Sequence, residues 1–397
     1  MSLPARLVLE DGRVFHGRSF GAHADGGLET VAEVVFNTSH TGYQEVLTDP
    51  SYCGEAVTFA IPILGVYGVA GDLDAQSARP RAAAMICREV SRHASNYRSK
   101  ETLPAYLTRH GIPGIEEIDT RTLTQHLRDH GSQLGALSND ATLTDQELAE
   151  RARQAPRMEG QDLAKLVTTQ APYSWTTGFS SETAPWSDGL PEPVAEPGSA
   201  GRVVVVDFGV KYDILRHLVD HGCEVTVVPA SSTLEEILAH DPQGIFLSNG
   251  PGDPAAVSYA VETVQRLVAA APCPIYGICL GHQILCLALG AKTHHMKFGH
   301  RGSNHPVRQA SSGRVLITAQ NHGFAVDVAS LSATPLEPSY TSLFDGCLEG
   351  VRHKSLPIES VQFHPEAGPG PHEAAEFFAQ FAAAIQAAPS PSPQQAT

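Results

Sequence analysis

The sequence predicts an α/β protein, in which an N-terminal mixed β/α domain precedes a doubly wound, mostly parallel sheet. Three observations lead to this prediction. The length of 397 residues is enough for two hydrophobic cores. A segment rich in Pro, Ser, Thr, Gly and acidic residues divides the chain near its middle. Beyond that segment, short apolar runs alternate with helical patterns, which is typical of a parallel sheet covered by helices.

These observations also give domain boundaries. We expect four segments: an N-terminal domain at residues 1–167, a linker at 168–200, a second domain at 201–387 and a tail at 388–397. The tail consists mainly of Pro, Ser, Gln and Ala, and we expect it to be disordered. Trp175 or Trp186 is a candidate for anchoring the linker against one of the domains.

The N-terminal domain begins with the signal of a β-hairpin. Two apolar runs, at 7–9 and 14–15, flank the polar turn 10–13. Further strands are expected at 31–36 and 56–60. The segment between these two strands is polar and rich in turn formers, so its composition alone indicates a surface loop.

Two helix starts are marked in the same domain. Asp119 or Thr120 is a suitable N-cap for a helix in which Leu123 and Leu127 share a face. Residues 144–147 form a capping box that opens another short helix.

The second domain alternates strands and helices. The expected strands are the apolar runs 203–206, 224–228, 244–248 and 274–278. The expected helices are 211–221, two that begin near Thr233 and Pro254, one at 280–289 and a last one from His372 to about Ala387. The pattern after Gly290 is turn-rich and indicates an antiparallel region. In a parallel sheet, functional groups gather at the carboxyl ends of the strands.

One cysteine directly follows the fourth of these strands. Cys279 stands between Gly277 and Gly281, and a helical pattern stopped by Gly290 comes after it. Strand, sharp turn and helix are the geometry of a nucleophile elbow, here with sulfur in place of oxygen. We predict that Cys279 is an exposed nucleophile that ionises readily at the helix N-terminus. The alternative is a buried structural cysteine, which is how we interpret Cys286, two turns further along.

A cysteine nucleophile needs a base, and the base needs an orienting group. Residues 358–363 read as a strand, and His364 falls at its end. Pro365 disfavours helical backbone at His364 and so holds the imidazole on an extended segment. Glu366 can then lie on the same side and accept a hydrogen bond from the ring. The sequence therefore predicts a triad of Cys279, His364 and Glu366, recognised by the roles of its members.

A second turn at the same predicted sheet edge contains Gly250 and Gly252. Gly-Pro-Gly is common in tight turns, so the turn could be a connection only. The functional interpretation is that the backbone N–H groups of Gly252 and Leu280 form an oxyanion hole. Glycine would be required because a side chain would block the tetrahedral oxygen. No Gly-rich phosphate-binding motif occurs in the chain, so we expect no ATP chemistry on it.

Four histidines raise the question of a metal site: His294, His295, His300 and His305. Their spacing matches no standard site, and no cysteine or paired carboxylate joins them. We therefore predict that the chain holds no metal and no cofactor of its own.

The composition argues against several other classes of protein. A net charge of −16 argues against binding to nucleic acid. The seven cysteines are scattered and form no C-x-x-C pair, which favours reduced thiols. Residues 1–12 show no signal-peptide pattern, and no apolar run is long enough for a membrane helix. We expect a cytoplasmic protein with no nucleic acid and no membrane as a partner.

Several motifs together resemble a known family. Residues 277–283 and 364–366 are similar to the class I, or triad, glutamine amidotransferases. Three N-terminal segments, 36–45, 48–52 and 119–124, resemble the small, glutamine-hydrolysing subunit of carbamoyl-phosphate synthetase. The motifs stand in the family's order, and the resemblance covers nearly the whole chain apart from the linker and the tail.

The resemblance implies a set of glutamine contacts: Ser51, Gly250, Gly252, Leu280, Gln283, Asn321, Gly323 and Phe324. Ser51 would reach across from the N-terminal domain. The turn at 321–324 would hold the α-amino and carboxylate end of glutamine largely through backbone groups, with help from Gln283. His322 is expected to be structural or to support the residues that contact glutamine. The histidine-rich segment resembles the lining of the family's glutamine site, which accounts for it without a metal.

The resemblance further implies a reaction and a partner. Glutamine would be hydrolysed to glutamate and ammonia through a thioester on Cys279. The ammonia would pass to a large synthetase subunit, which binds ATP and magnesium, and the N-terminal domain would provide much of the docking surface. Three alternatives stay open: an amidotransferase of a different synthase, a non-catalytic scaffold, and a free-standing cysteine hydrolase or peptidase.

Overall fold

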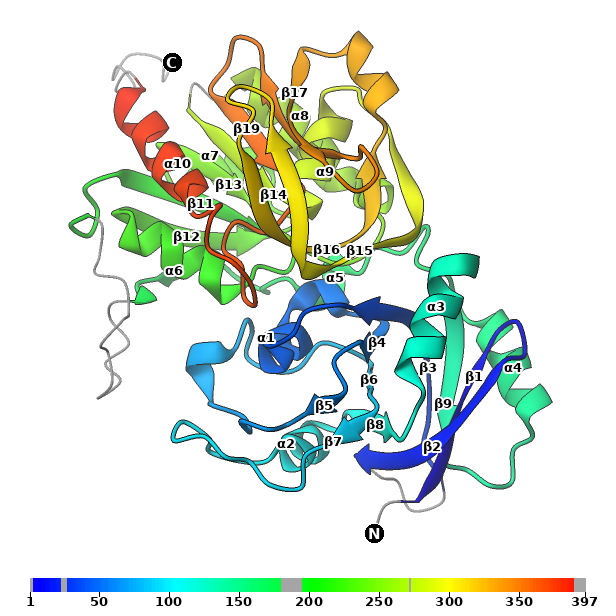
Figure 1. Cartoon of the computed structure of the whole chain (residues 1–397). Coiled ribbons are helices and arrows are strands. Elements are labelled where there is room, and N and C mark those ends of the chain that lie inside the picture. The colour runs from blue at the N-terminus through cyan, green and yellow to red at the C-terminus, as the bar shows by residue number, and fades with distance from the viewer. Residues whose placement is uncertain (1–2, 23–26, 180–194, 271–272, 389–397) are drawn as a thin grey trace.

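The computed structural model describes residues 3–22, 27–179, 195–270 and 273–388. These residues form two units: a closed barrel, and a large sheet with helices on both faces. The two units lie against each other (Figure 1). The predicted α/β class is confirmed. Most of the predicted tail and the middle of the predicted linker, with Trp186, fall outside the described residues, so the domain boundaries stay predictions.

The first unit is a closed barrel in the order β1-β2-β8-β6-β4-β3-β9. Its strands are β1 (Pro4–Leu9), β2 (Val14–Gly21), β3 (Glu29–Asn37), β4 (Glu55–Phe59), β6 (Ala84–Ile86), β8 (Pro113–Glu116) and β9 (Gln133–Ser138). The expected hairpin is β1–β2, and β4 is parallel to both of its neighbours, β3 and β6. The sequence pattern did not predict that these strands close into a barrel. A further short pair, β5 (Ile63–Leu64) and β7 (Glu89–Val90), lies beside it.

Short helices lie between and after the barrel strands along the chain: α1 (Tyr43–Thr48), α2 (Leu103–His110), α3 (Thr120–His130), α4 (Asp145–Gln154) and α5 (Ala164–Val167). The expected caps of two of them are confirmed. The Asp119 carboxylate accepts a hydrogen bond from the N–H of Thr122 at 3.0 Å, and Thr144 with Glu147 forms the capping box of α4. The segment between β3 and β4 is not a surface loop. It forms α1 and a 3₁₀ turn whose side chains are mostly buried, because its apolar residues pack in a core of the first unit and the segment also lies against the second unit (Figure 1).

The second unit is a ten-stranded sheet in the order β10-β12-β11-β13-β14-β19-β18-β17-β15-β16. Its strands are β10 (Tyr173–Trp175), β11 (Gly201–Asp207), β12 (Cys223–Pro229), β13 (Gly244–Leu247), β14 (Ile275–Ile278), β15 (Thr293–Gln309), β16 (Val315–Val326), β17 (Leu336–Ser342), β18 (Leu348–His353) and β19 (Ile358–Val361). The strands from β12 to β19 in this order are parallel, and those from β18 to β16 are antiparallel, as expected after Gly290. Trp175 lies on β10 within the predicted linker, and its ring is 4.8 Å from that of Tyr212.

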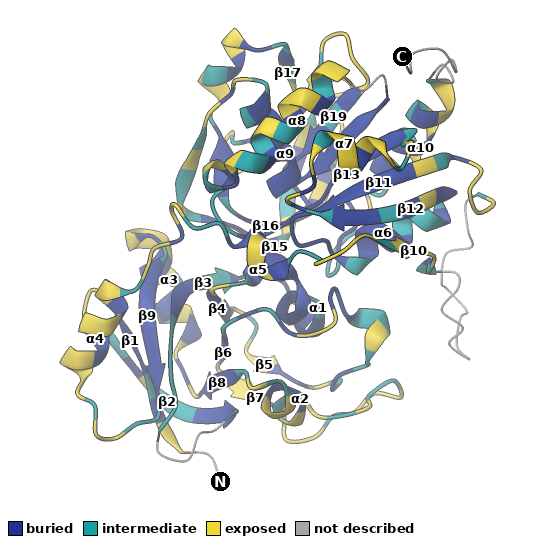
Figure 2. Cartoon of the chain, turned by 180° about the vertical axis from the view of Figure 1, so that it is seen from behind, coloured by how far each residue is buried: buried dark blue, intermediate teal, exposed yellow. Residues whose placement is uncertain are grey.

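Helices cover both faces of this sheet: α6 (Tyr212–Asp220), α7 (Leu234–Leu238), α8 (Ser258–Ala270), α9 (Leu280–Ala288) and α10 (Glu376–Ala387). One core contains α6 and α10, and the other contains α7, α8 and α9. The strands between them are buried on both faces (Figure 2), which explains their unbroken apolar runs. The last helix begins later than expected because residues 372–375 form a turn. Among the described residues, no helix is both long enough and apolar enough to cross a membrane.

Candidate active site

Cys279 occupies the turn between β14 and α9. Its backbone has φ 52° and ψ −105°, which an L-residue rarely adopts, as expected of a strained nucleophile elbow. The flanking glycines allow the sharp turn. A Cβ on Gly281 would stand 2.3 Å from the carbonyl oxygen of Leu247, and one on Gly277 would stand 3.0 Å from the backbone of Gly281. Cys279 is only 2% exposed, so the prediction of an exposed sulfur is wrong; the residue lines a pocket instead.

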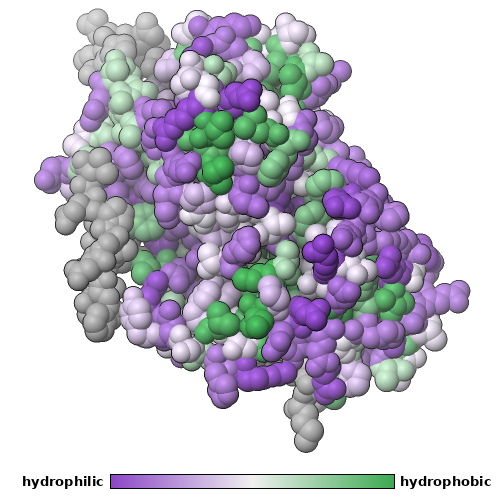
Figure 3. Space-filling model, viewed as in Figure 1, coloured by the Kyte–Doolittle hydropathy of each residue, from purple (hydrophilic) through white to green (hydrophobic). Residues whose placement is uncertain are grey.

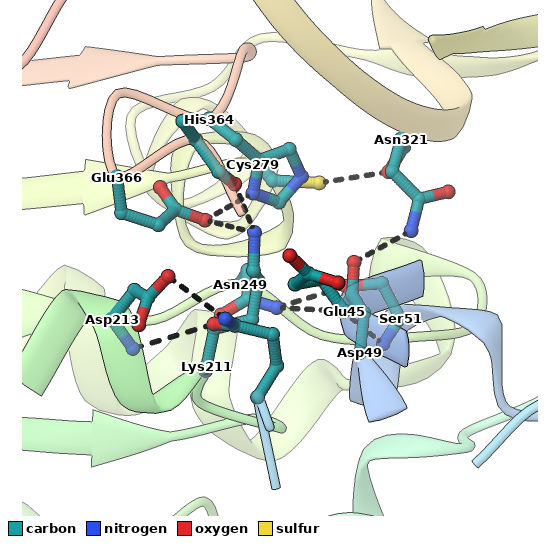
Figure 4. Close-up of polar contacts among 12 residues, drawn as sticks. Glu45, Asp49, Ser51, Lys211, Asp213, Asn249, Cys279, Asn321, His364 and Glu366 are labelled. Atoms are coloured by element: carbon teal, nitrogen blue, oxygen red, sulfur yellow. Dashed lines mark hydrogen bonds and ion pairs between the residues drawn. The ribbon is translucent and has the colours of Figure 1, made fainter. Parts of the chain in front are cut away.

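His364 and Glu366 lie beside this cysteine, as Figure 4 shows. The Nδ1 of His364 donates to the Glu366 carboxylate over 2.6 Å, and both side chains are buried. The Nε2 of His364 has no partner within normal hydrogen-bond geometry among the described residues and lies next to the Cys279 sulfur. The sulfur itself is 3.5 Å from the backbone oxygen of Asn321. The three residues therefore have the arrangement of nucleophile, base and orienting acid.

A lysine completes the charges of this group. The Nζ of Lys211 is 3.0 Å from Oε1 of Glu366 and also donates to the carbonyl of Ala367, deep in the protein. Burial raises the pKa of Glu366, but the Lys211 ammonium and His364 lower it to about 2. Burial lowers the pKa of His364, yet the Glu366 carboxylate outweighs it and raises the pKa to about 10. At neutral pH the base is thus an imidazolium held between the carboxylate and the sulfur.

Sequence reasoning missed Lys211. A signal was available, since this lysine follows β11, which ends at the same carboxyl edge of the sheet as β14. A basic residue within a buried α/β edge is unusual unless it is paired.

The two predicted oxyanion donors lie in turns next to the cysteine. Leu280 is the first residue of α9, and Gly252 follows β13 with φ +93°. In the part of the chain that the structure describes, neither N–H donates to a protein acceptor. The structure gives a further reason for glycine at position 252. A Cβ there would meet the backbone oxygen of Gln161 at 2.6 Å, so glycine is required by its left-handed φ and by the packing of the adjacent loop.

The pocket in front of Cys279 has a volume of about 390 Å³ including its open mouth. It is lined by predicted glutamine contacts: Ser51, Gly250, Gly252, Gln283, Asn321, Gly323 and Phe324. Leu280 does not line it, because its side chain packs in the core and only its backbone can face a ligand. The amide nitrogen of Gln283 already donates to the Phe324 carbonyl at 2.8 Å and to the side chain of Gln362 at 2.9 Å. Only its carbonyl oxygen therefore remains for a ligand.

Comparisons with known proteins give the family. A profile of the family Glutamine amidotransferase class-I matches residues 204–384, and one of the Carbamoyl-phosphate synthase small chain, CPSase domain, matches residues 7–137. The carbamoyl phosphate synthase small chain of Syntrophotalea carbinolica is 49% identical over 382 residues, 96% of this chain and 97% of that protein. The chain belongs to the carbamoyl phosphate synthase small chain family.

A further relative agrees with this assignment. The carbamoyl phosphate synthase small chain of Escherichia coli K12 is 50% identical over 386 residues, 96% of this chain and 97% of that protein. A glutamine amidotransferase of known structure from Thermotoga maritima is 22% identical, with a TM-score of 0.34, over 42% of this chain and 76% of that one. The family resemblance of the motifs is confirmed. The chain is the amidotransferase part of a glutamine-hydrolysing carbamoyl phosphate synthase.

In this small-chain protein, polar contacts from the barrel domain complete the site (Figure 4). The Oγ of Ser51 accepts a hydrogen bond from the side chain of Asn249 at 2.9 Å. The Asp49 carboxylate accepts one from the side chain of Asn321, also at 2.9 Å. Asp49 and Ser51 lie on the segment that composition indicated as a loop. The turns that carry a predicted oxyanion donor and predicted glutamine contacts are therefore tied to the other domain.

The pocket also contains charges that the sequence did not predict. Arg301 on β15 pairs with Glu55 on β4, with Nε 3.2 Å from Oε2, and both side chains are buried. Burial raises the pKa of Glu55, and although Arg301 lowers it, the pKa remains raised at about 7. Glu33 and His295 stand at the same wall, 3.9 Å apart. A zwitterionic ligand would thus meet both signs of charge.

The histidine-rich segment, which contains His294, His295, His300 and His305, differs in one respect from what the sequence predicted. The Nε2 of His300 is 3.0 Å from Asp345, and its Nδ1 is 3.5 Å from Glu349. The argument that no paired carboxylate joins the histidines is therefore wrong, because these carboxylates come from a distant part of the sequence. His322 is buried, and its Nδ1 bonds to the Phe324 carbonyl at 2.8 Å, as its expected structural role suggests.

Proposed function

We propose that this chain hydrolyses the side-chain amide of L-glutamine through a covalent thioester on Cys279. The observation that carries the proposal is the juxtaposition of Cys279, His364 and Glu366, with Cys279 lining a pocket shared by both domains. The cysteine sulfur attacks the amide carbon, and the N–H groups of Gly252 and Leu280 stabilise the oxyanion. Such donors are worth about 3 kcal/mol each in acyl transfer.

His364 moves the protons of the cycle. As the C–N bond breaks, its Nε2–H protonates the departing nitrogen, which leaves as ammonia. The neutral ring then takes a proton from water, which attacks the γ-glutamyl thioester and releases glutamate and the Cys279 thiolate. Glu366 and Lys211 hold the ring and its charge through this cycle. No step requires a metal or a cofactor on this chain.

A second cavity offers ammonia a way out of the site. It is lined by His364 and Asn321 on one side and by residues of the barrel domain, such as Ser39 and Asp49, on the other. His364 lines this cavity, Cys279 lines the glutamine pocket and Asn321 lines both, which supports transfer of the product through the protein. The relatives named above are small chains, which supports a large subunit with its ATP and magnesium as the recipient.

The surface of the barrel domain supports such docking. Ile63, Val66 and Tyr97 are exposed there, and apolar side chains gather on the face of both domains in Figure 3.

The seven cysteines are all unpaired, which supports a reducing, cytoplasmic setting.

Cys279→Ser tests the proposal, with Cys286→Ala on the same helix as the control. We expect glutaminase activity to fall about 10³-fold or more in the first variant and to stay near the wild-type rate in the second. With a large subunit, Cys279→Ser should still support carbamoyl phosphate synthesis from free ammonia but not from glutamine. Undiminished glutamine-dependent synthesis by Cys279→Ser would instead refute the role assigned to this cysteine.

A further inference from the structure

Three buried side chains converge behind the glutamine pocket. His300 on β15 and His322 on β16 are direct cross-strand partners. Glu349 lies on β18, which is separated from β15 by β17 in the order of the sheet. They are 5%, 4% and 0% exposed. Each offers a possible ligand atom, and these atoms all lie within 4.8 Å of one another. The proposed hydrolysis does not use this cluster.

The hydrogen bonds at the edge of the cluster fix which atoms face its centre. The Nδ1 of His322 faces the Phe324 carbonyl at 2.8 Å, and since a carbonyl only accepts, Nδ1 carries the proton. Its Nε2 is then unprotonated and can only accept; it is buried and has no partner among the described residues. The Nε2 of His300 donates in the same way to the Asp345 carboxylate, which leaves its Nδ1 facing inward.

The third side chain also turns an acceptor inward. One oxygen of Glu349 accepts from the side chain of Gln320 at 2.8 Å. The other is 3.5 Å from Nδ1 of His300 and has no hydrogen-bond partner in the described part of the chain. With His300 neutral, three acceptors therefore face one another, and no other described residue donates to them.

Three kinds of occupant could satisfy these atoms. A proton on His300 would serve Glu349 but would leave the Nε2 of His322 unpaired, and that loss has a cost of about 1–3 kcal/mol. A water molecule has two donors and so reaches at most two of the three acceptors. A divalent cation can bind all three at once. Two imidazoles and a carboxylate are a donor set that suits Zn²⁺ in particular.

We propose that His300, His322 and Glu349 form a binding site for a divalent transition-metal ion, with zinc as the best match. The site has the carboxylate–histidine support that metal ligands commonly show, since Asp345 orients His300. His305 is a candidate fourth ligand. Its ring lies 5.2 Å from that of His300, and its Nδ1 is a further buried atom without a partner among the described residues.

The location gives the metal a structural role at the glutamine pocket. His322 lines that pocket and precedes Gly323 and Phe324, which are predicted to hold the substrate. A metal bound to Nε2 of His322 would hold this turn in the shape shown here. None of the proposed ligands belongs to the triad, so the metal would affect the affinity for glutamine and the stability of the domain more than the chemical step.

Metal titration of the full chain tests this site. The chain is made without a histidine tag and in the Cys279→Ser background, so that the nucleophile cannot bind the ion. After chelation, it is titrated with Co²⁺ and Zn²⁺ and followed by visible absorption, metal analysis and thermal unfolding. The variants are Glu349→Gln and His300→Gln. His294→Gln is the control, because His294 is exposed on the same strand outside the cluster.

We expect one equivalent of metal to bind to the parent chain and to His294→Gln, with a rise in the unfolding temperature. Glu349→Gln should fold, since it keeps the shape of the side chain, and should bind at least about tenfold more weakly. The proposal is overturned if the parent chain takes up no stoichiometric metal, or if Glu349→Gln and His300→Gln bind it as tightly as the parent. The cluster would then be satisfied by protons and water.

Discussion

Replacing Glu366 by Gln removes the charge that holds His364 as an imidazolium while keeping the shape of the side chain. The pKa of about 10 for His364, against an ordinary 6.5, corresponds to about 5 kcal/mol in favour of the charged ring. Most of that preference should vanish in the variant, and the pKa should fall toward or below 6.5. The reaction requires the protonated ring to release ammonia, so the alkaline limb of kcat/KM against pH should move down by about 3 pH units.

The same substitution predicts a pH-dependent loss of stability. Because the pKa of His364 is raised in the folded state, its stabilising contribution is complete below about pH 6.5 and disappears as the pH rises toward 10. Leaving Lys211 and His364 without their carboxylate should reduce the free energy of unfolding by about 3–5 kcal/mol near pH 6. The difference from wild type should shrink above pH 9.

The assay is glutamate release between pH 6 and 10, combined with denaturant unfolding at both ends of that range. Glu359→Gln is the matched control, because Glu359 lies on β19, is half-buried and pairs in register with β18 away from His364. Near pH 7 we expect Glu366→Gln to lower kcat about 10²-fold and Glu359→Gln to leave it unchanged. An alkaline limb at the same pH in wild type and Glu366→Gln would refute the role assigned to the carboxylate.

Three further predictions concern the walls of the site. Ser51→Ala should raise KM for glutamine about fivefold with little change in kcat, because one neutral hydrogen bond is worth about 1 kcal/mol; a fall in kcat alone would contradict this. Gly252→Ala should lower kcat about 10²-fold by displacing an oxyanion donor, measured against Gly160→Ala, which shares a positive φ but has open space around it. Arg301→Met leaves Glu55 buried and without its partner. Near pH 8, where Glu55 is charged in the wild type, denaturant unfolding should show a loss of about 3–5 kcal/mol in the free energy of unfolding. Unchanged stability would show that the pair is not required.

The local sequence pattern was sufficient to predict the part of the site that is built from residues close together in the chain. Strand, cysteine and helix at 275–288 form one unit, and His364 is two residues from its orienting acid. Both arrangements depend on backbone geometry that neighbouring residues impose. The parallel sheet was predictable for a similar reason, because its strands are unbroken apolar runs separated by capped helices.

Contacts between distant segments could not be predicted in this way. Arg301 and Glu55 are 246 positions apart, and neither shows a local sign of its partner. The barrel closes through strands as short as β6 (Ala84–Ile86), which carry too few residues for a recognisable alternation. Glu349 joins the histidine cluster through the order of strands in the sheet, which composition does not reveal.

The central claim is that glutamine becomes bonded to one sulfur atom during turnover. Wild-type chain mixed with radiolabelled glutamine, quenched in acid within the first turnovers and digested, should yield a γ-glutamyl label on the peptide that contains Cys279. The same label should be absent from Cys279→Ser and unaffected in Cys286→Ala. Glutamate production at the full rate with no label on that peptide, or with the label on another residue, would contradict the account.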